Sequence, residues 1–234
     1  MSRANVAGTQ QKRHRGGMGE ERVLFIDAEA LVIDKPAGLS VHPGPRTRES
    51  LEDYLDDLRF GFARRPSPVH RLDRDTSGCL LLARHPKAHK RFQRAFEEGA
   101  VAKTYVAILD GILEEEEGMI DMPLAKVSTR EQGWRMVRDA NGKPAVTRWR
   151  RLAVREGRSA ILFTPATGRT HQLRVHAVAG LGAPIVGDPV YGAGNGPMLL
   201  HALSLRLERP GKKPVEARAP LPSSFAQAGF GDVA

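Results

Sequence analysis

Short apolar segments rich in β-branched residues recur along this chain, and glycine, proline or polar turns separate them. These segments predict strands at residues 23–26, 31–33, 79–83, 101–109, 145–154, 159–164 and 199–207. No regular alternation of strand and helix links them, which argues against a sheet assembled from repeated βαβ units. The pattern therefore predicts an α+β domain with a largely antiparallel or mixed central sheet.

Helical spacing of apolar residues occurs in three places. Ser50 precedes a segment with apolar residues at 51, 54, 55 and 58, and Asp53 completes a pattern similar to a capping box. Residues 87–98 predict a second helix with lysines and arginines on one face, which is more typical of a solvated surface than of phosphate contacts. Thr170 is expected to cap a third helix, over residues 171–179.

The length of 234 residues suffices for one substantial core, and we expect a single domain over residues 23–234. Residues 1–22 are polar and basic without apolar periodicity, which predicts a flexible tail. The apolar runs are far shorter than the roughly 20 residues of a membrane helix. The single cysteine, Cys79, cannot form an internal disulfide and is expected in the core. These features predict a soluble cytoplasmic protein without a membrane partner.

Positive charge narrows the class of partner. The chain has 36 lysines and arginines against 27 aspartates and glutamates, a formal net charge of +9 at pH 7. Such a surplus favours binding to polyanions, and nucleic acid is the leading candidate. Charge alone leaves a second interpretation open, in which the surface is basic but binds nothing.

Residues 69–78 concentrate ionisable side chains directly before the apolar run at 79–83. A polar loop that emerges from a buried strand is a common position for a functional site, because the sheet holds it rigidly. The alternative interpretation is a loop whose aspartates and serine only satisfy backbone donors.

A second polar segment, residues 167–176, places a glycine turn before a short helix that carries two arginines and two histidines. Arginine and helix N-termini both suit anions. Arg174, four positions after Thr170, could reach across a cleft toward a carboxylate. The alternative is a purely structural ion pair.

Five motifs in order resemble those of the RluA-type RNA pseudouridine synthases. Residues 70–78 read HRLDRDTSG and match the family hallmark HRLDxxTSG. The other matches are DKPAG at 34–38, KTY at 103–105, GRTHQLRVH at 168–176 and PIVGDPVYG at 184–192. The resemblance covers residues 23–225, and several motifs in the right order are a far stronger signal than any one of them.

The resemblance implies the pseudouridine synthase fold and an isomerase that converts uridine in RNA to pseudouridine without a cofactor or a metal. It implies that Asp73 is the catalytic carboxylate and that Arg174 holds this carboxylate ionised against the effect of burial. The target base must be flipped out of its stack. Tyr105 is then expected to stack on the uracil, Leu173 to wall the opposite side, and Arg71 to fill the space that the base leaves.

The resemblance also implies structured ribosomal or transfer RNA as the partner, and a monomeric protein. Because the match begins near residue 23, we expect no separate N-terminal RNA-binding module. Three chemical roles for Asp73 stay open: attack on the sugar, addition to the uracil ring, or removal of a sugar proton.

Other interpretations compete with this one. Asp75 is the alternative candidate for the catalytic carboxylate assigned to Asp73. Ser77 with the histidine and aspartate of its own segment could suggest a hydrolase triad, but three members so close in sequence are hard to align. His85 and His89 have the spacing of metal ligands but lack further ligands. An RNA-binding protein that has lost its chemistry is the alternative from another class, and the complete set of catalytic residue types argues against it.

Overall fold

A computed structural model describes residues 18–44, 47–129 and 133–234. The strands have the following bounds: β1 Val23–Ile26, β2 Ala30–Lys35, β3 Ser67–Pro68, β4 Ser77–Ala83, β5 Val101–Leu109, β6 Glu117–Asp121, β7 Leu124–Thr129, β8 Gly133–Arg138, β9 Val146–Arg155, β10 Arg158–Pro165, β11 Leu200–Arg209 and β12 Lys212–Arg218. The α-helices have these bounds: α1 Pro86–Glu97, α2 Gln172–Val175 and α3 Ser223–Gln227.

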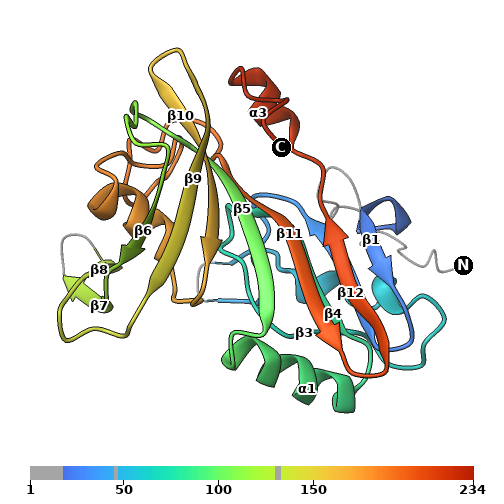
Figure 1. Cartoon of the computed structure of the whole chain (residues 1–234). Coiled ribbons are helices and arrows are strands. Elements are labelled where there is room, and N and C mark those ends of the chain that lie inside the picture. The colour runs from blue at the N-terminus through green and yellow to red at the C-terminus, as the bar shows by residue number, and fades with distance from the viewer. Residues whose placement is uncertain (1–17, 45–46, 130–132) are drawn as a thin grey trace, which may run out of the picture.

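Ten of these strands join into one curved sheet, and β7 and β8 form a hairpin beside it (Figure 1). The order along the sheet is β1-β2-β4-β11-β5-β10-β9-β6, with β12 paired to β11 and β3 to β4. Among the described strands, β4 and β11 are the parallel pair, and the other pairs are antiparallel. The predicted α+β class with a mixed, largely antiparallel sheet is confirmed.

The centre of the sheet joins segments that are far apart in the sequence. Strand β11 lies between β4 and β5, and Ala202 of β11 is registered with Gly78 on one side and with Tyr105 on the other. Gly78, at the end of the polar segment 69–78, therefore lies level with Tyr105 of β5 across the sheet. This register fixes the position of the loop that precedes β4.

Gly78 is required for this close pairing. Its φ is +104°, a conformation that residues with a side chain rarely adopt. A Cβ atom at this position would lie 2.2 Å from the carbonyl oxygen of Ala202. Only glycine lets β11 approach β4 here.

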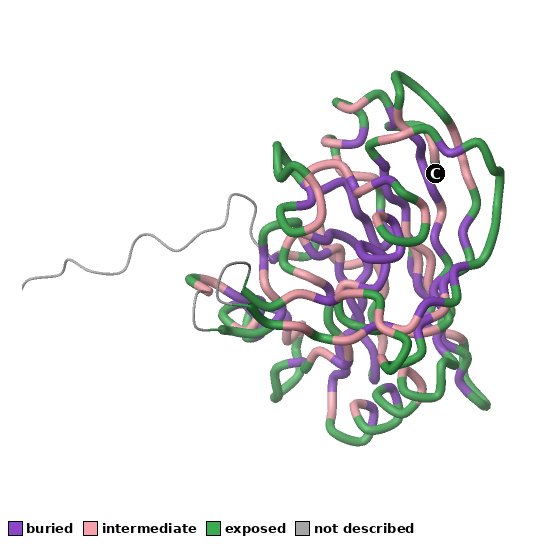
Figure 2. Tube along the Cα trace, turned by 90° about the vertical axis from the view of Figure 1, so that its left-hand side faces the viewer, coloured by how far each residue is buried: buried purple, intermediate pink, exposed green. Residues whose placement is uncertain are grey.

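Buried residues line the strands in the interior, while the connecting loops are mostly exposed (Figure 2). Helix α1 packs Ala88 and Phe92 into an apolar cluster with residues of β4, β11 and β12. Cys79 lies in the same cluster, and burial raises the pKa of its thiol to about 12. Cys79 is therefore a core residue, as the sequence predicts.

The predicted tail extends too far. Residues 1–17 of the predicted segment 1–22 lie outside the described residues. Met18 is buried in an apolar cluster with Leu31, and Glu20–Arg22 forms a 3-10 turn. Arg22 also donates a hydrogen bond of 3.3 Å to the carbonyl of Asp34. The boundary at residue 22 is wrong because burial of the Met18 side chain holds this segment against the sheet.

The segment after Ser50 is helical, but it forms two 3-10 turns, Leu51–Tyr54 and Asp57–Arg59, in place of one amphipathic α-helix. The predicted capping box is present, because Asp53 accepts a 2.9 Å hydrogen bond from the Ser50 amide. Phe60 adopts a left-handed conformation directly after the second turn. Spacings of three and four residues fit both helix types, so the sequence could not separate them.

The sequence pattern does not predict strands β6, β7, β8 and β12 or helix α3. In β12, Val215 and Ala217 are buried, whereas charged side chains alternate with them on the exposed face. Charged residues occupy four of the seven positions of β12, which hides its strand pattern.

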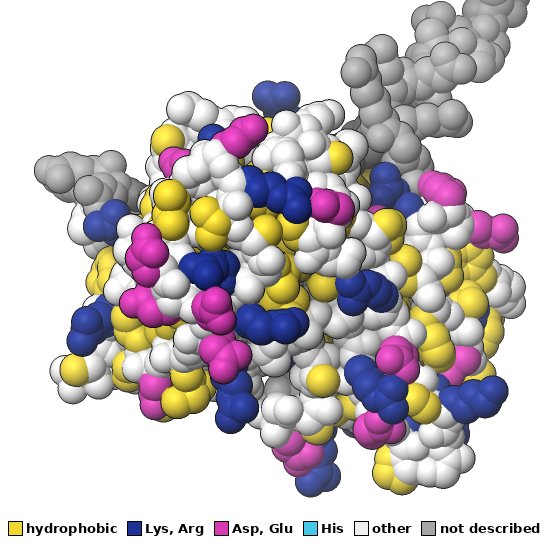
Figure 3. All heavy atoms as spheres, turned by 45° about the horizontal axis from the view of Figure 1, so that its top comes forward, with side chains coloured by type: hydrophobic (Ala, Val, Ile, Leu, Met, Phe, Trp, Pro, Cys, Tyr) yellow, Lys and Arg dark blue, Asp and Glu magenta, His cyan; other side chains and the backbone are white. Residues whose placement is uncertain are grey.

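On the face shown in Figure 3, lysine and arginine side chains are interspersed with aspartates and glutamates. This face does not form a continuous basic surface. No helix in the described residues is both long enough and apolar enough to cross a membrane.

We expect Gly78→Ala to destabilise the protein by at least about 3 kcal/mol, because left-handed strain and a steric clash act together. Urea unfolding followed by circular dichroism measures the effect. The matched control is Gly61→Ala, since Gly61 also has a positive φ, +83°, but a Cβ there meets nothing within 4 Å. This control should cost about 1 kcal/mol. Equal losses for both variants would contradict the role assigned to the β4–β11 contact.

Candidate active site

A cavity of about 440 Å³ brings the two polar segments of the sequence together. Its walls come from the loop before β4, the end of helix α1 with the turn that follows it, strand β5, the end of β10 with helix α2, and the first residue of β11. The residues singled out from the sequence that line it are Arg71, Asp73, Tyr105, Leu173 and Arg174. Leu173 and Arg174 are buried, and Arg71 is exposed.

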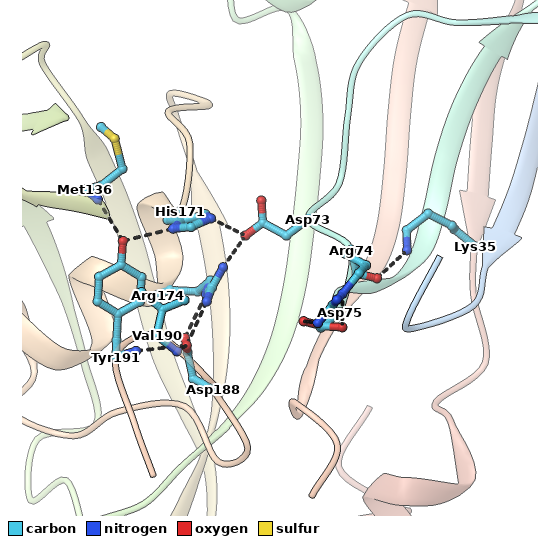
Figure 4. A network of polar contacts seen from close by, with 10 residues as sticks. All are labelled: Lys35, Asp73, Arg74, Asp75, Met136, His171, Arg174, Asp188, Val190 and Tyr191. Carbon is cyan, nitrogen blue, oxygen red and sulfur yellow. Dashed lines mark hydrogen bonds and ion pairs between the residues drawn. The ribbon is translucent and has the colours of Figure 1, made fainter. Parts of the chain in front are cut away.

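Asp73 lies on the loop between β3 and β4 and faces the cavity. Its side chain is 19% exposed, so it is not in bulk solvent. Its Oδ2 atom accepts a hydrogen bond of 3.0 Å from Nη1 of Arg174, which comes from helix α2 (Figure 4). The arrangement places the carboxyl group of Asp73 at the cavity and in contact with a buried guanidinium.

Arg174 is itself held by a second carboxylate. Its Nε and Nη2 atoms donate to the two oxygens of Asp188, each at 2.7 Å, so that Nη1 is left for Asp73. Asp188 is fully buried and also accepts hydrogen bonds from the amides of Val190 and Tyr191. Burial acts to raise the pKa of Asp188, but the hydrogen bonds and the charge of Arg174 hold this pKa below its usual value. A bidentate pair of this kind fixes the guanidinium plane.

His171 lies beside the same carboxylate. Its Nε2 atom is 3.8 Å from Oδ2 of Asp73, and its Nδ1 atom is 2.9 Å from the hydroxyl of Tyr191. The Tyr191 oxygen accepts a hydrogen bond from the Met136 amide, which leaves its own proton free to donate to Nδ1. This assigns the ring proton to Nε2, toward Asp73. Burial lowers the pKa of His171, which favours this neutral tautomer.

His171 also corrects the prediction for this segment. Thr170 does not cap the helix; His171 is the N-cap and has a left-handed φ of +51°. The α-helix ends at Val175, and a π-helical turn over His176–Gly180 replaces the predicted regular helix. A non-glycine residue with positive φ is strained, and its side chain here is fixed by contacts in the site. Sequence periodicity carries no signal for such contacts.

Lys35 supports the loop that carries Asp73. It is fully buried, and its Nζ atom donates hydrogen bonds to the carbonyls of Pro36, Leu39 and Arg74 at 2.7, 2.8 and 3.1 Å. Burial lowers the pKa of Lys35 to about 7, and nearby aspartates including Asp73 oppose this shift. The ammonium group has three protons for these three acceptors. Lys35 thus joins the turn at 35–39 to the residue after Asp73.

Tyr105 packs against two apolar clusters of the core. Burial raises the pKa of its hydroxyl, and the negative charge of Asp73 adds to this effect. The phenol is therefore neutral at physiological pH. Leu173 is 7% exposed and presents an apolar wall to the same cavity.

The residues named in the competing interpretations make other contacts in the structure. Asp75 does not line the cavity and pairs with Arg74 at 2.9 and 3.1 Å. Ser77 forms a buried hydrogen bond of 2.8 Å with Nδ1 of His201, whose Nε2 faces the carbonyl of Ala219 and not a carboxylate. No Ser-His-Asp triad forms from these residues.

The metal interpretation of His85 and His89 also has no support in the geometry. His85 caps helix α1 by accepting from the Ala88 amide at 3.1 Å, and His89 contacts the carbonyl of Pro68. No group of three or more potential metal ligands occurs within the described residues.

The profile of the RNA pseudouridylate synthase family matches residues 29–179 of this chain. An uncharacterised RNA pseudouridine synthase of Zymomonas mobilis is 59% identical over 214 residues, which cover 90% of this chain and 98% of the relative. The chain belongs to the RNA pseudouridine synthase family. It is an isomerase that acts on RNA.

Two further similarities agree with this assignment. Ribosomal large subunit pseudouridine synthase D of Zymomonas mobilis is 37% identical over 179 residues, which cover 73% of this chain and 55% of the relative. The structure of human RNA pseudouridylate synthase domain containing 4 is similar with a TM-score of 0.76 at 27% identity, covering 89% of this chain and 91% of the other.

We expect replacement of Lys35 in this pseudouridine synthase by methionine to lower the free energy of unfolding by about 2 kcal/mol or more. The variant leaves the carbonyls of Pro36 and Leu39 without this donor, whereas the carbonyl of Arg74 keeps the Gly38 amide. Each unsatisfied buried group costs about 1 to 3 kcal/mol before relaxation. Turnover should also fall, because the loop with Asp73 loses its support. Urea unfolding and an activity assay measure both effects. The control is Lys213→Met at an exposed position, which should change stability by less than about 0.5 kcal/mol.

Acid should destabilise the synthase through its buried histidines. Burial lowers the pKa of His201 to about 4, whereas in the unfolded chain it has the ordinary value of about 6.5. Between these values the unfolded state binds the proton and the folded state does not, so stability falls as the pH is lowered.

From pH 6.5 to 4.5 the contribution of His201 should decrease by roughly 2 kcal/mol. Urea unfolding at several pH values measures the slope, and His201→Gln should reduce it. The same slope in the native protein and in the variant would show that other groups cause the acid sensitivity.

Proposed function

We propose that this synthase isomerises a uridine of structured RNA with Asp73 as the catalytic carboxylate. In this reaction the N1–C1′ glycosidic bond breaks, the uracil rotates, a C5–C1′ bond forms, C5 loses its proton, and N1 takes up a proton. The observation that carries the proposal is the contact between Asp73 and Arg174 at the wall of the cavity. A carboxylate near the reacting sugar and base is the group this isomerisation needs, and the cavity walls limit the access of water to the detached uracil.

The remaining cavity residues suit the binding of a flipped base. Extruding a uridine costs a few kcal/mol of stacking and pairing, and an aromatic ring can return about 1 to 3 kcal/mol by stacking. Tyr105 is proposed to stack on the uracil, with Leu173 on the opposite side. Arg71 is exposed at the cavity, and it is proposed to occupy the space that the base leaves in the RNA.

Ribosomal RNA is the favoured substrate, with transfer RNA as the alternative. The support is the relative named ribosomal large subunit pseudouridine synthase D. We propose that the enzyme is a monomer. We place it in the cytoplasm with its RNA, and the proposed chemistry uses neither cofactor nor metal.

We expect Asp73→Asn to abolish turnover while it retains most RNA affinity, because phosphate contacts dominate affinity. Tritium release from 5-tritiated uridine in cellular RNA measures turnover, and a filter-binding assay measures affinity. The matched control is Asp75→Asn, which removes a carboxylate two residues away that does not line the cavity.

Full turnover by the Asp73 variant would move the catalytic role elsewhere. No release by the native protein from any cellular RNA would contradict the proposed reaction. Comparison of pseudouridine positions in cells with and without the protein identifies the substrate.

A further inference from the structure

One tryptophan is exposed beside the candidate active site. Trp134 lies on β8 and is 45% exposed, whereas the other tryptophan, Trp149, is 8% exposed. Proteins that bind single-stranded nucleic acid use exposed aromatic side chains as platforms on which bases stack. We propose that Trp134 stacks on a nucleobase next to the target uridine, a proposal that rests on the function proposed above.

The position of Trp134 relative to the catalytic carboxylate carries this proposal. Its ring stacks on His171, with ring centroids 5.0 Å apart and an interplanar angle of 29°. The Nε2 atom of His171 is in turn 3.8 Å from Asp73. One imidazole ring therefore bridges the indole and the carboxylate. Because flipping takes the target base out of its stack, the adjoining base loses a stacking partner and can stack on the indole instead.

The indole is held in a fixed place. Tyr191 accepts a hydrogen bond from the amide of Met136, two residues after Trp134 on β8, and contacts His171 through the same hydroxyl. The Tyr191 amide donates to Asp188, which holds the catalytic arginine. The hairpin that carries the indole is thus tied to the catalytic pair. A preorganised ring binds a base with little loss of conformational entropy.

The charge of the hairpin agrees with an RNA strand as the ligand. Strands β7 and β8 carry Lys126, Arg135 and Arg138 and contain no acidic residue within their described ranges. The Nζ atom of Lys126 lies 5.1 Å from the Trp134 ring. Exposed aromatic rings with neighbouring cations are the usual means of binding single-stranded nucleic acid, because the ring stacks on a base and the cations contact phosphates. Target uridines in loops offer such unpaired neighbours.

Fluorescence tests the contact directly, because the chain has two tryptophans. In a Trp149→Phe variant, Trp134 is the only tryptophan, and we expect bulk cellular RNA to quench its fluorescence emission. Inorganic polyphosphate, a polyanion without bases, should leave the emission unchanged. If the Trp149→Phe chain does not fold, the difference in quenching between the native chain and Trp134→Phe gives the same measurement.

Kinetics separate stacking from a merely structural role. We expect Trp134→Leu to raise the apparent KM for 5-tritiated RNA by roughly five- to a hundredfold while kcat changes little. Trp134→Phe, which keeps an aromatic ring, should recover most of the loss. Ile26→Ala is the control, since Ile26 is 43% exposed but lies on β1 at the other end of the sheet.

A fall in kcat with unchanged KM in Trp134→Leu would assign the indole a structural role and overturn the proposal. Quenching by polyphosphate as strong as by RNA would also overturn it. Both outcomes leave the proposed reaction intact. Quenching by RNA without tritium release would support the stacking site and contradict the proposed reaction.

Discussion

The contact on which the site depends is the one between Arg174 and two carboxylates. Burying a guanidinium with Asp73 and Asp188 is costly unless every donor and acceptor has a partner. Asp188 helps to meet this condition, because it forms a bidentate pair with Arg174 and also accepts hydrogen bonds from two backbone amides. Because Asp188 occupies two of the guanidinium nitrogens, the third is directed at Asp73. The orientation of Arg174 toward the carboxylate is therefore set by the turn after residue 187, outside the segments that supply the expected site residues.

The sheet brings these groups together through a single close pairing. Gly78 lets β11 approach β4, and the register of β11 then places Tyr105 in the same row. Lys35 fixes the loop from the other side by donating to the carbonyl of Arg74. Strand pairing and one buried ammonium group thus determine where the carboxylate lies. The strand pairing and the Lys35 hydrogen bonds both hold the short loop between β3 and β4.

Much of the fold was open to prediction from local patterns. Strand β5 agrees with its predicted bounds, and the helix predicted over 87–98 is α1, shifted by one residue at each end. Apolar alternation or spacing marks these elements because one face of each is buried. Strand β12 was not predicted because charged residues dominate its exposed face. The segment at 171–179 was predicted as a regular helix, but contacts of His171 in the site give it a left-handed start.

The order of the motifs by itself indicated the family and the class of reaction, and it singled out Arg71, Asp73, Tyr105, Leu173 and Arg174, which line the cavity. A motif is a set of residue types at fixed spacing, so it is readable without any knowledge of distances in space. The tertiary structure alone decided that Asp188 holds Arg174, that Lys35 holds the loop that carries Asp73, and that Trp134 stacks on His171 beside that carboxylate. These are contacts between residues far apart in the chain, and only the packing of the sheet and its hairpin brings them within bonding distance.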